Sequence, residues 1–520
     1  MSDKYLRGSE WRKWDLHVHT PESIIHHYTG QNPWKKFIED LEQLPTEFKV
    51  LGINDYIFLD GYEKVLEYKS RGRLQNIDLI LPVLEFRIEK FAGHKDFKRI
   101  NFHIIFSNDL APNIMQQQFL NALTSKYKLT PGLDGITWCG SITKESIKDL
   151  GAKIKGSVPK EKLKDYGSDF EEGFNNLCLD EDEILKILKD NTYLNEKYIT
   201  AIGKTEWDSL AWNDQSIATK KDVINKVDFV FISAEDLERF NLAKDKLTER
   251  KVNNLLLDCS DAHSYSDANV KDRIGKCFSW IKADPTFEGL KQILSEPDER
   301  IFVGHMPPKM NYVNDNKTKY MKSVKIEKKS DATITETWFD DNMIPLNPGL
   351  IAIIGNKGKG KSALSDIIGL LGNTKQYANF TFLSEENFRR PKDNKARNFQ
   401  ATIEWESSAQ FTKGLDDEVD MLKPELVKYI PQNYLENICT QLGKIEETDF
   451  DRELKKVIFS HLDAPDHLGK SSLDDLIAYK TSEADDKIQI LKQELHTINE
   501  KIVLLEDEGQ PTYKQKLENL

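Results

Sequence analysis

The sequence contains few cysteines and no long apolar run. Its five cysteines are widely spaced and form no CxxC pair, which argues against a disulfide framework and for a reducing, cytoplasmic setting (Cys139, Cys178, Cys259, Cys277 and Cys439). No stretch approaches the roughly 18–20 apolar residues that span a bilayer. The first twenty residues are polar. We therefore expect neither a membrane span nor a secretory signal.

An excess of basic residues is also missing. The chain has 73 Lys and Arg against 86 Asp and Glu, a net charge of −13, so its overall field repels phosphate backbones. Any contact with nucleic acid would need a local basic stripe. The lysine-rich segment 309–329 is the best candidate, although its composition favours a solvated linker. The length of 520 residues predicts about three domains.

Short apolar runs alternate with helical segments through the first 305 residues, which predicts an α/β barrel of parallel strands. The stretches Pro33–Leu44 and Asp222–Lys226 have helical composition, and residues 107–197 are expected to be an insertion with an exposed loop at Gly151–Gly167. Seven strands are predicted, at Lys13–His19, Val50–Asn54, Leu79–Glu85, Ile100–Phe106, Ile199–Gly203, Asp228–Ile232 and Leu255–Asp258.

A second α/β unit is expected after a basic linker at 306–332, and it would extend over residues 333–475. Its predicted elements are strands at Thr333–Phe339, Leu350–Ile354, Gln400–Trp405 and Val427–Ile430 and a helix at Lys361–Leu371.

Histidines and carboxylates stand at several predicted strands of the first unit. His17 and His19 are two apart in a strand, so they face one way and could share a metal ion. Asp261 and His263 follow another apolar strand. Each residue alone suggests only a structural role. Because parallel barrels place their chemistry at strand C-termini, the set together predicts a catalytic metal site of His17, His19, Asp55, Glu85, His103, Asp261 and His263.

This order of residues resembles the PHP (polymerase and histidinol phosphatase) superfamily. The segment 273–290 is similar to PHP proteins fused to an SMC/ABC-like AAA ATPase, of the TrlF type. The resemblance covers about 300 residues and implies a distorted (β/α)7 barrel. It also implies that His17, His19, Glu85 and Asp261 hold one metal, while Glu85, His103 and His263 contribute to a second.

Several positions depart from that pattern. Tyr56 stands where the superfamily often has a histidine ligand. A further histidine usually follows the first pair, and His26 and His27 align only loosely with it. The superfamily's ligand late in the barrel would fall near Gly203–Glu206, where only Glu206 could coordinate a metal ion. We therefore expect one or two ions of Mn, Zn or Fe, which suit histidine and carboxylate ligands. Two such ions clamp a phosphate ester and activate water, so the expected reaction is phosphoester hydrolysis.

The second unit carries a GxxxxGK[ST] loop, typical of ATP-binding P-loops, between an apolar run and a helix. Glycine backbone N–H groups would cradle the phosphates, Lys361 would reach the β- and γ-phosphates, and Ser362 would bind Mg²⁺. A chance Gly/Lys-rich loop is the alternative. The expected ATP-binding residues are Gly355, Asn356, Gly358, Lys359, Gly360, Lys361, Ser362, Ala363 and Gln432.

Gln432 ends an apolar run that resembles the Q-loop of SMC- and ABC-type ATPases, and would contact Mg²⁺. Apolar residues spaced three and four apart between Ile488 and Leu505 then predict a coiled coil within 476–520, with a single core helix as the alternative. We find no LSGGQ-like signature and no Asp-Glu strand end. The chain thus resembles the first lobe of an SMC-like ATPase head, and a homodimer or a second polypeptide would complete that head.

The leading hypothesis is a metal-dependent phosphoesterase, a nuclease controlled by the ATP-binding module, which the resemblance links to antiviral defence. The alternative is an ATP-responsive nucleic-acid-binding or scaffold protein with a degenerate barrel. A small-molecule phosphatase is a third hypothesis, although such an enzyme has no need of an SMC-like head.

Overall fold

The computed structural model describes residues 6–92, 98–133, 135–203, 217–339, 342–430 and 449–519. The chain divides into two compact units. The first comprises Met1–Lys325, Asn342–Ala352 and Ile403–Gln410, and the second comprises Ile326–Asp341, Ile353–Thr402 and Phe411–Leu520. Part of the segment expected as a linker is folded, since it contains α13 (Pro308–Asp315) and β12 (Met321–Lys328).

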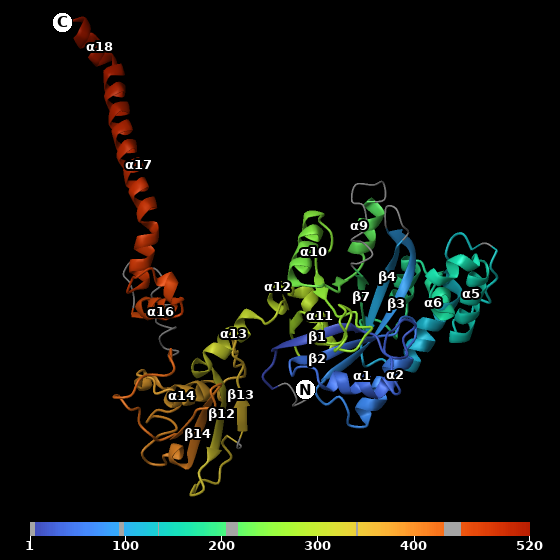
Figure 1. Cartoon of the computed structure of the whole chain (residues 1–520). Coiled ribbons are helices and arrows are strands. Elements are labelled where there is room, and N and C mark those ends of the chain that lie inside the picture. Colours follow the sequence, from blue (N-terminus) through green and yellow to red (C-terminus); the bar gives the residue numbers. More distant parts are fainter. Residues whose placement is uncertain are drawn as a thin grey trace. The chain divides into compact units, whose positions relative to one another are not determined.

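A nearly closed, barrel-like sheet of nine strands forms the first unit (Figure 1), in the order β11-β10-β1-β2-β3-β4-β7-β8-β9. Near its two ends, Val18 forms a parallel bridge with Ala262, just beyond β9. The strands are β1 (Trp11–Val18), β2 (Phe48–Asn54), β3 (Leu79–Ala92), β4 (Lys98–Phe106), β7 (Tyr198–Gly203), β8 (Phe229–Ile232), β9 (Leu256–Asp258), β10 (Ser279–Lys282) and β11 (Ile301–Val303).

All seven predicted strands are confirmed, but the expectation that they are all parallel is wrong. β4 runs antiparallel to both β3 and β7, and β10 and β11 add two further antiparallel strands. For β3 and β4 the reason is the length of the connection, because a parallel crossover needs about a dozen residues or more. Only residues 93–97 separate β3 from β4. The sheet is therefore mixed.

The two faces of this sheet have separate apolar clusters. On the outer face, helices such as α1 (Pro33–Glu42) and α10 (Leu237–Glu249) bury apolar residues against the strands. Asn32 caps α1 by accepting a hydrogen bond from the Lys35 N–H, and Pro33 suits the first helical turn. On the other face, alternate strand residues pack with α11 (Phe287–Ser295). The predicted helices at Pro33–Leu44 and Asp222–Lys226 are confirmed, the latter within α9 (Ile217–Asn225).

The segment between β4 and β7 is largely helical. It contains α3 (Pro112–Met115), α4 (Asn121–Leu123), α5 (Lys144–Gly156), α6 (Asp169–Asn175) and α7 (Glu181–Asp190), with a short β5 (Lys128–Leu129) and β6 (Leu177–Cys178). The loop expected at Gly151–Gly167 starts later than predicted, because Gly151 lies inside α5. A Cβ there would lie 1.8 Å from the carbonyl oxygen of Asp169, so the glycine allows α5 and α6 to approach closely.

The second sheet has the order β13-β12-β14-β15. Its other strands are β13 (Asn342–Pro345), β14 (Phe399–Trp405) and β15 (Gln410–Gly414). The predicted strand at Gln400–Trp405 is confirmed, and so is the helix α14 (Lys361–Leu371). The strands predicted at Thr333–Phe339, Leu350–Ile354 and Val427–Ile430 are wrong. Within the described ranges no neighbouring strand pairs with them, and an isolated strand leaves its backbone groups without partners.

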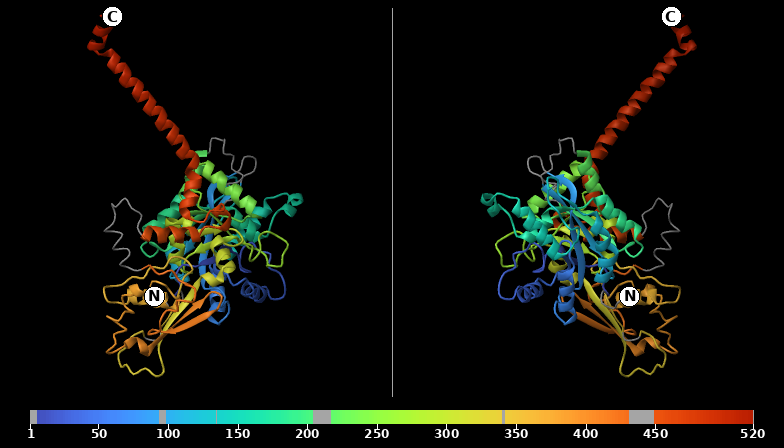
Figure 2. Two further views of the ribbon diagram at one scale, coloured as in Figure 1. Left: turned by 90° about the vertical axis from the view of Figure 1, so that its left-hand side faces the viewer. Right: turned by 90° about the vertical axis from the view of Figure 1, so that its right-hand side faces the viewer.

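Three helices end the described chain: α16 (Asp449–Ser460), α17 (Leu473–Gly509) and α18 (Pro511–Glu518). The predicted helix is thus confirmed, and it ends where Gly509 and Pro511 interrupt the apolar pattern. α17 extends as one long rod (Figure 2), and among its residues only Leu476 is buried. The apolar residues spaced three and four apart from Ile488 to Leu505, here called the apolar seam, are between 46% and 66% exposed. In the single chain, therefore, α17 is not a packed core helix. No described helix is both long and apolar enough to cross a bilayer.

Candidate metal centre

Histidines and carboxylates from distant parts of the first unit meet in one cluster. His17 and His19 stand at the end of β1, and Asp261 and His263 follow β9. The antiparallel register of β3 and β4 places Glu85 directly opposite His103. His103 therefore reaches the cluster through antiparallel pairing, and not from the C-terminal end of a parallel strand as expected.

The ligand atoms converge on His17. Its Nε2 lies 3.1 Å from His19 Nε2, 3.1 Å from Asp261 Oδ1 and 3.4 Å from Glu85 Oε2. His103 Nε2 lies 3.4 Å from the same Glu85 oxygen. Within this cluster, two groups of donors have all their ligand atoms within 4.8 Å of one another, namely His17, His19 and Glu85, and His19, Asp261 and His263.

The donor set fits a divalent transition metal. Ligands that each lie at about 2.1 Å from one ion are separated from each other by about 3.0–3.4 Å, as these atoms are. His103 is 1% exposed, and among the described residues neither of its ring nitrogens has a well-formed hydrogen bond. Such unsatisfied buried nitrogens are costly unless a ligand or ion engages them. The Asp261 side chain, 35% exposed, is the most accessible member of the cluster.

Hydrogen bonds fix which ring nitrogens can bind a metal. His263 Nδ1 lies 2.7 Å from the carbonyl oxygen of Asp261, which can only accept, so Nδ1 carries the proton. In the neutral ring Nε2 then has a free lone pair, and Tyr56 Oη lies 3.2 Å from it. His19 Nδ1 lies 2.9 Å from Ser23 Oγ, so its Nε2 also faces the cluster. Outer partners of this kind orient metal-binding histidines.

Burial and neighbouring charges separate the pKa values of the cluster. Burial, together with the neighbouring His263 and His17, lowers the pKa of His19 to about 3. Burial would also lower the pKa of His17, but Asp261 and Glu85 raise it to about 9. Burial would raise the pKa of Glu85, whereas His103, His17 and Arg87 hold it well below its usual range. Neighbouring histidines of the cluster therefore differ in pKa in opposite directions, because His17 lies closest to the two carboxylates and His19 lies beside two other imidazoles.

Asp55 lies apart from these donor groups. Its carboxylate accepts hydrogen bonds from the backbone N–H of Thr20 at 2.9 Å and from the Thr20 hydroxyl at 2.7 Å. Burial raises the pKa of Asp55 to about 7 despite these two bonds. A Cβ on Gly61 would lie 1.7 Å from Asp55 Oδ2, so a glycine at this position is needed for the Asp55 carboxylate to reach Thr20. Asp55 holds the turn that follows His19 and is a positioning residue here.

Three further residues shape the centre. Asn54 Nδ2 lies 2.7 Å from His17 Nε2 and 2.8 Å from Glu85 Oε2. Arg87 donates to Glu85 Oε1 at 2.9 Å. Tyr56 is buried and adopts a left-handed backbone with φ of 60°. Tyr56 was expected as a departure from the superfamily pattern, whereas the places of Asn54 and Arg87 in the cluster were not predicted. Arg87 lies two residues beyond Glu85 on the same face of β3, a periodicity that could have indicated it.

In the second unit the loop before α14 has part of the expected P-loop geometry. Gly358 and Gly360 adopt left-handed backbone conformations with φ of 82° and 89°, and Gly360 precedes the first helical turn. Lys361 Nζ donates to the loop carbonyls of Gly355 at 2.7 Å and Asn356 at 3.1 Å. Ala363 is buried and Ser362 is exposed.

The strand that should precede this loop does not form. Leu350 and Ile354 are 99% and 90% exposed. Gln432 lies outside the described residues, so its place near the loop stays a prediction. In comparisons with known proteins, no protein-family model and no curated protein matches this chain.

Proposed function

We propose that the first unit is a divalent-metal-dependent phosphoesterase, as its resemblance to the PHP superfamily implies. Its pairing with an SMC-like ATP-binding unit favours nucleic acid as the substrate. The observation that carries this proposal is the convergence of His17, His19, Glu85 and Asp261 on one cluster, from the end of β1, from β3 and from the loop after β9. Chance clustering of buried, imperfectly satisfied histidines is disfavoured because each costs desolvation energy.

A bound ion of Mn, Zn or Fe would supply a Lewis acid for the phosphate and lower the pKa of water. The residues around it have distinct tasks. Glu85 and Asp261 supply negative charge, and Arg87 orients Glu85 through Oε1 while leaving Oε2 directed at the histidines. The partly exposed Asp261 marks the side from which a phosphodiester would enter.

We further propose that the second unit binds ATP and Mg²⁺ and controls the first. Support comes from the two left-handed glycines and from Lys361, which caps loop carbonyls where phosphate oxygens would compete for its ammonium group. Ser362 and Gln432 would hold Mg²⁺. A homodimer, or a second polypeptide, would complete the head, and the exposed seam of α17 suits such association. Antiviral defence is the role that the resemblance suggests.

One observation favours a different function. Asn54 and Tyr56 already contact the inward nitrogens of His17 and His263, so protein donors occupy positions that a metal would need. On that view the barrel is degenerate, and the chain is an ATP-responsive nucleic-acid-binding or scaffold protein. Such a barrel would purify without stoichiometric metal.

The deciding experiment measures metal content by mass spectrometry alongside cleavage of labelled DNA and RNA, with and without ATP. We expect about one or two ions per chain and metal-dependent cleavage, both lost in the His17→Ala, Asp261→Ala double variant. His496→Ala, on the exposed part of α17, is the matched control and should change neither.

Two outcomes would contradict the proposal. Cleavage that persists in the double variant would locate the activity elsewhere, and a metal-free parent would favour the degenerate barrel. Turnover of small phosphomonoesters without cleavage of DNA or RNA would favour a small-molecule phosphatase.

A further inference from the structure

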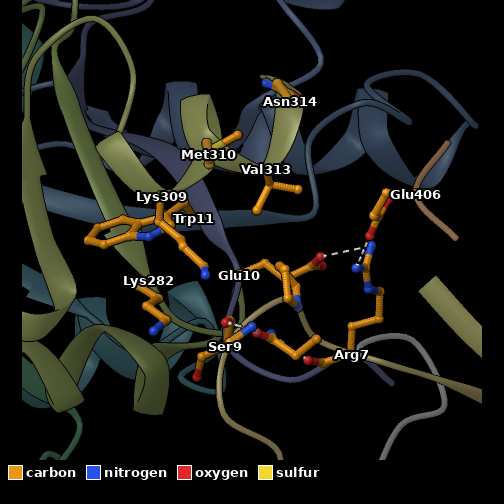
Figure 3. A pocket seen from close by; sticks show the side chains of 13 residues that line it. Arg7, Ser9, Glu10, Trp11, Lys282, Lys309, Met310, Val313, Asn314 and Glu406 are labelled. Carbon is orange, nitrogen blue, oxygen red and sulfur yellow. Dashed lines mark hydrogen bonds and ion pairs between the residues drawn. The ribbon is translucent and has the colours of Figure 1, made fainter. Parts of the chain in front are cut away.

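A cavity of about 280 Å³ (Figure 3) lies beside Trp11, which begins β1, whereas His17 lies near the other end of this strand. All its lining residues belong to the first unit. The indole of Trp11 contributes from β1, Lys282 from β10, and Met310 and Val313 from α13. Six residues of extended strand separate Trp11 from His17, a distance of about 20 Å. The cavity is therefore distinct from the proposed catalytic centre.

The carboxylates in the cavity wall are already paired. Arg7 forms ion pairs with Glu406 and, at 3.4 Å, with Glu10. Arg12 lies 3.1 Å from the other oxygen of Glu10. The Arg7 Nε–H also donates to the carbonyl oxygen of Leu346 at 2.8 Å, which fixes the guanidinium. The charge left for a ligand is therefore that of the lysines.

Lys282 and Lys309 carry this unpaired positive charge. Lys282 is the direct antiparallel partner of Trp11, so the two side chains leave the sheet on the same face. In the part of the chain that the structure describes, no residue forms an ion pair with the Lys282 ammonium. Lys309 Nζ donates to Tyr320 Oη at 3.0 Å and keeps two N–H donors. Figure 3 shows both side chains at the cavity beside Trp11.

A hydroxyl donor completes the polar wall. Ser9 Oγ accepts a hydrogen bond from Arg300 Nη1 at 3.3 Å, which leaves the hydroxyl hydrogen of Ser9 free to donate. Asn347, in contrast, is fully engaged, because its amide donates to the backbone of Arg7 and Ser9 and its Oδ1 accepts from Gly349. The site thus offers two ammonium groups and a hydroxyl next to an aromatic and apolar surface.

We propose that this cavity binds a nucleoside monophosphate, with the base against Trp11 and the apolar side chains of α13, and the phosphate between Lys282, Lys309 and Ser9. Aromatic rings stack on bases of any sequence, and lysine binds phosphate as a point charge. The volume is at the small end of ligand cavities, which favours a single nucleotide over a larger ligand. Binding here does not depend on the proposed phosphoesterase activity.

The test is calorimetric titration of the full chain with AMP, adenosine and inorganic phosphate, in EDTA so that no metal site contributes. We expect AMP to bind at least tenfold more tightly than either fragment. The Lys282→Ala, Lys309→Ala variant should weaken AMP binding at least tenfold, and Trp11→Leu should do the same. Lys35→Ala, on the exposed side of α1, and Lys361→Ala, in the glycine-rich loop, should leave it unchanged.

Four results would overturn the proposal: no AMP binding at millimolar concentration, binding that survives the double lysine variant, loss of binding in Lys361→Ala, or adenosine binding as tightly as AMP. A 5′-phosphorylated tetranucleotide that binds more tightly than AMP, with the same lysine dependence, would instead identify a strand end as the ligand. The double lysine variant changes only side chains at the cavity surface, so loss of folding would not obscure its result.

Discussion

The two candidate sites of this chain are held in opposite ways. In the metal centre His17, His19, Glu85 and His103 are each no more than 5% exposed, and strand pairing sets their positions. In the glycine-rich loop, residues 351–360 are all exposed, and Lys361 of the following helix donates to the loop carbonyls of Gly355 and Asn356. The metal centre is thus preorganised by tertiary packing, whereas the exposed loop has no comparable packing within the described residues.

The largest expected effect is the loss of metal affinity in Glu85→Gln, which should alter the metal centre and not the glycine-rich loop. Glu85→Gln removes the charge that His17, His103 and Arg87 surround, so we expect metal affinity to fall by more than about 100-fold. ATP affinity should not change. Titration calorimetry with Mn²⁺ and with ATP measures both. The reciprocal control is Lys361→Ala, which should weaken ATP binding and leave the metal content unchanged. Equal metal affinity in Glu85→Gln and the parent would contradict the assigned cluster.

A matched pair of glycine substitutions compares the rigidity of the two regions. A Cβ at Gly61 would overlap both Asp55 and Thr20, so Gly61→Ala should lower the free energy of unfolding by about 2–3 kcal/mol. Gly358 has open space around it, and only its φ of 82° opposes alanine, so Gly358→Ala should cost about 1 kcal/mol. Urea unfolding measures both. The reverse order would mean that the loop is the more constrained region.

The pH dependence of the free energy of unfolding tests the role of Asp55 beside the metal centre. Because burial raises the pKa of Asp55 to about 7, the folded state binds its proton more tightly than the unfolded state does. The resulting stabilisation is complete below the ordinary aspartate pKa and is lost as the pH rises through about 7. We expect Asp55→Asn to reduce this pH dependence by up to about 1.4 kcal/mol per unit between pH 4.5 and 7. An unchanged slope in chemical denaturation would contradict this assignment.

The smallest effect on stability is expected at the exposed seam of α17. Leu495 is 58% exposed, so Leu495→Gln should change the free energy of unfolding by less than about 0.5 kcal/mol. If the seam pairs with another helix, the same variant should shift the chain toward monomer in analytical ultracentrifugation. A loss of more than about 1 kcal/mol without any change in association would contradict an unpartnered helix.

Local patterns predicted the strands of the first unit well, because alternation and apolar runs are local properties. They failed in the second unit at Leu350–Ile354, where the run is apolar but has no partner strand among the described residues. They also failed at Gly151, where a glycine that suggested a loop serves a close contact between helices. A glycine or an apolar run does not itself specify its neighbour.

The amino-acid sequence alone determined which residues have the chemistry for the metal centre and where the long C-terminal helix ends, because side-chain type, strand periodicity and a glycine–proline break are written in the chain. Only the tertiary structure decided that His103 faces Glu85 across an antiparallel pair, that Asn54 and Arg87 join the cluster, and that Asp55 supports a turn. Those facts depend on strand direction and register, which connection lengths and packing fix across distant parts of the chain.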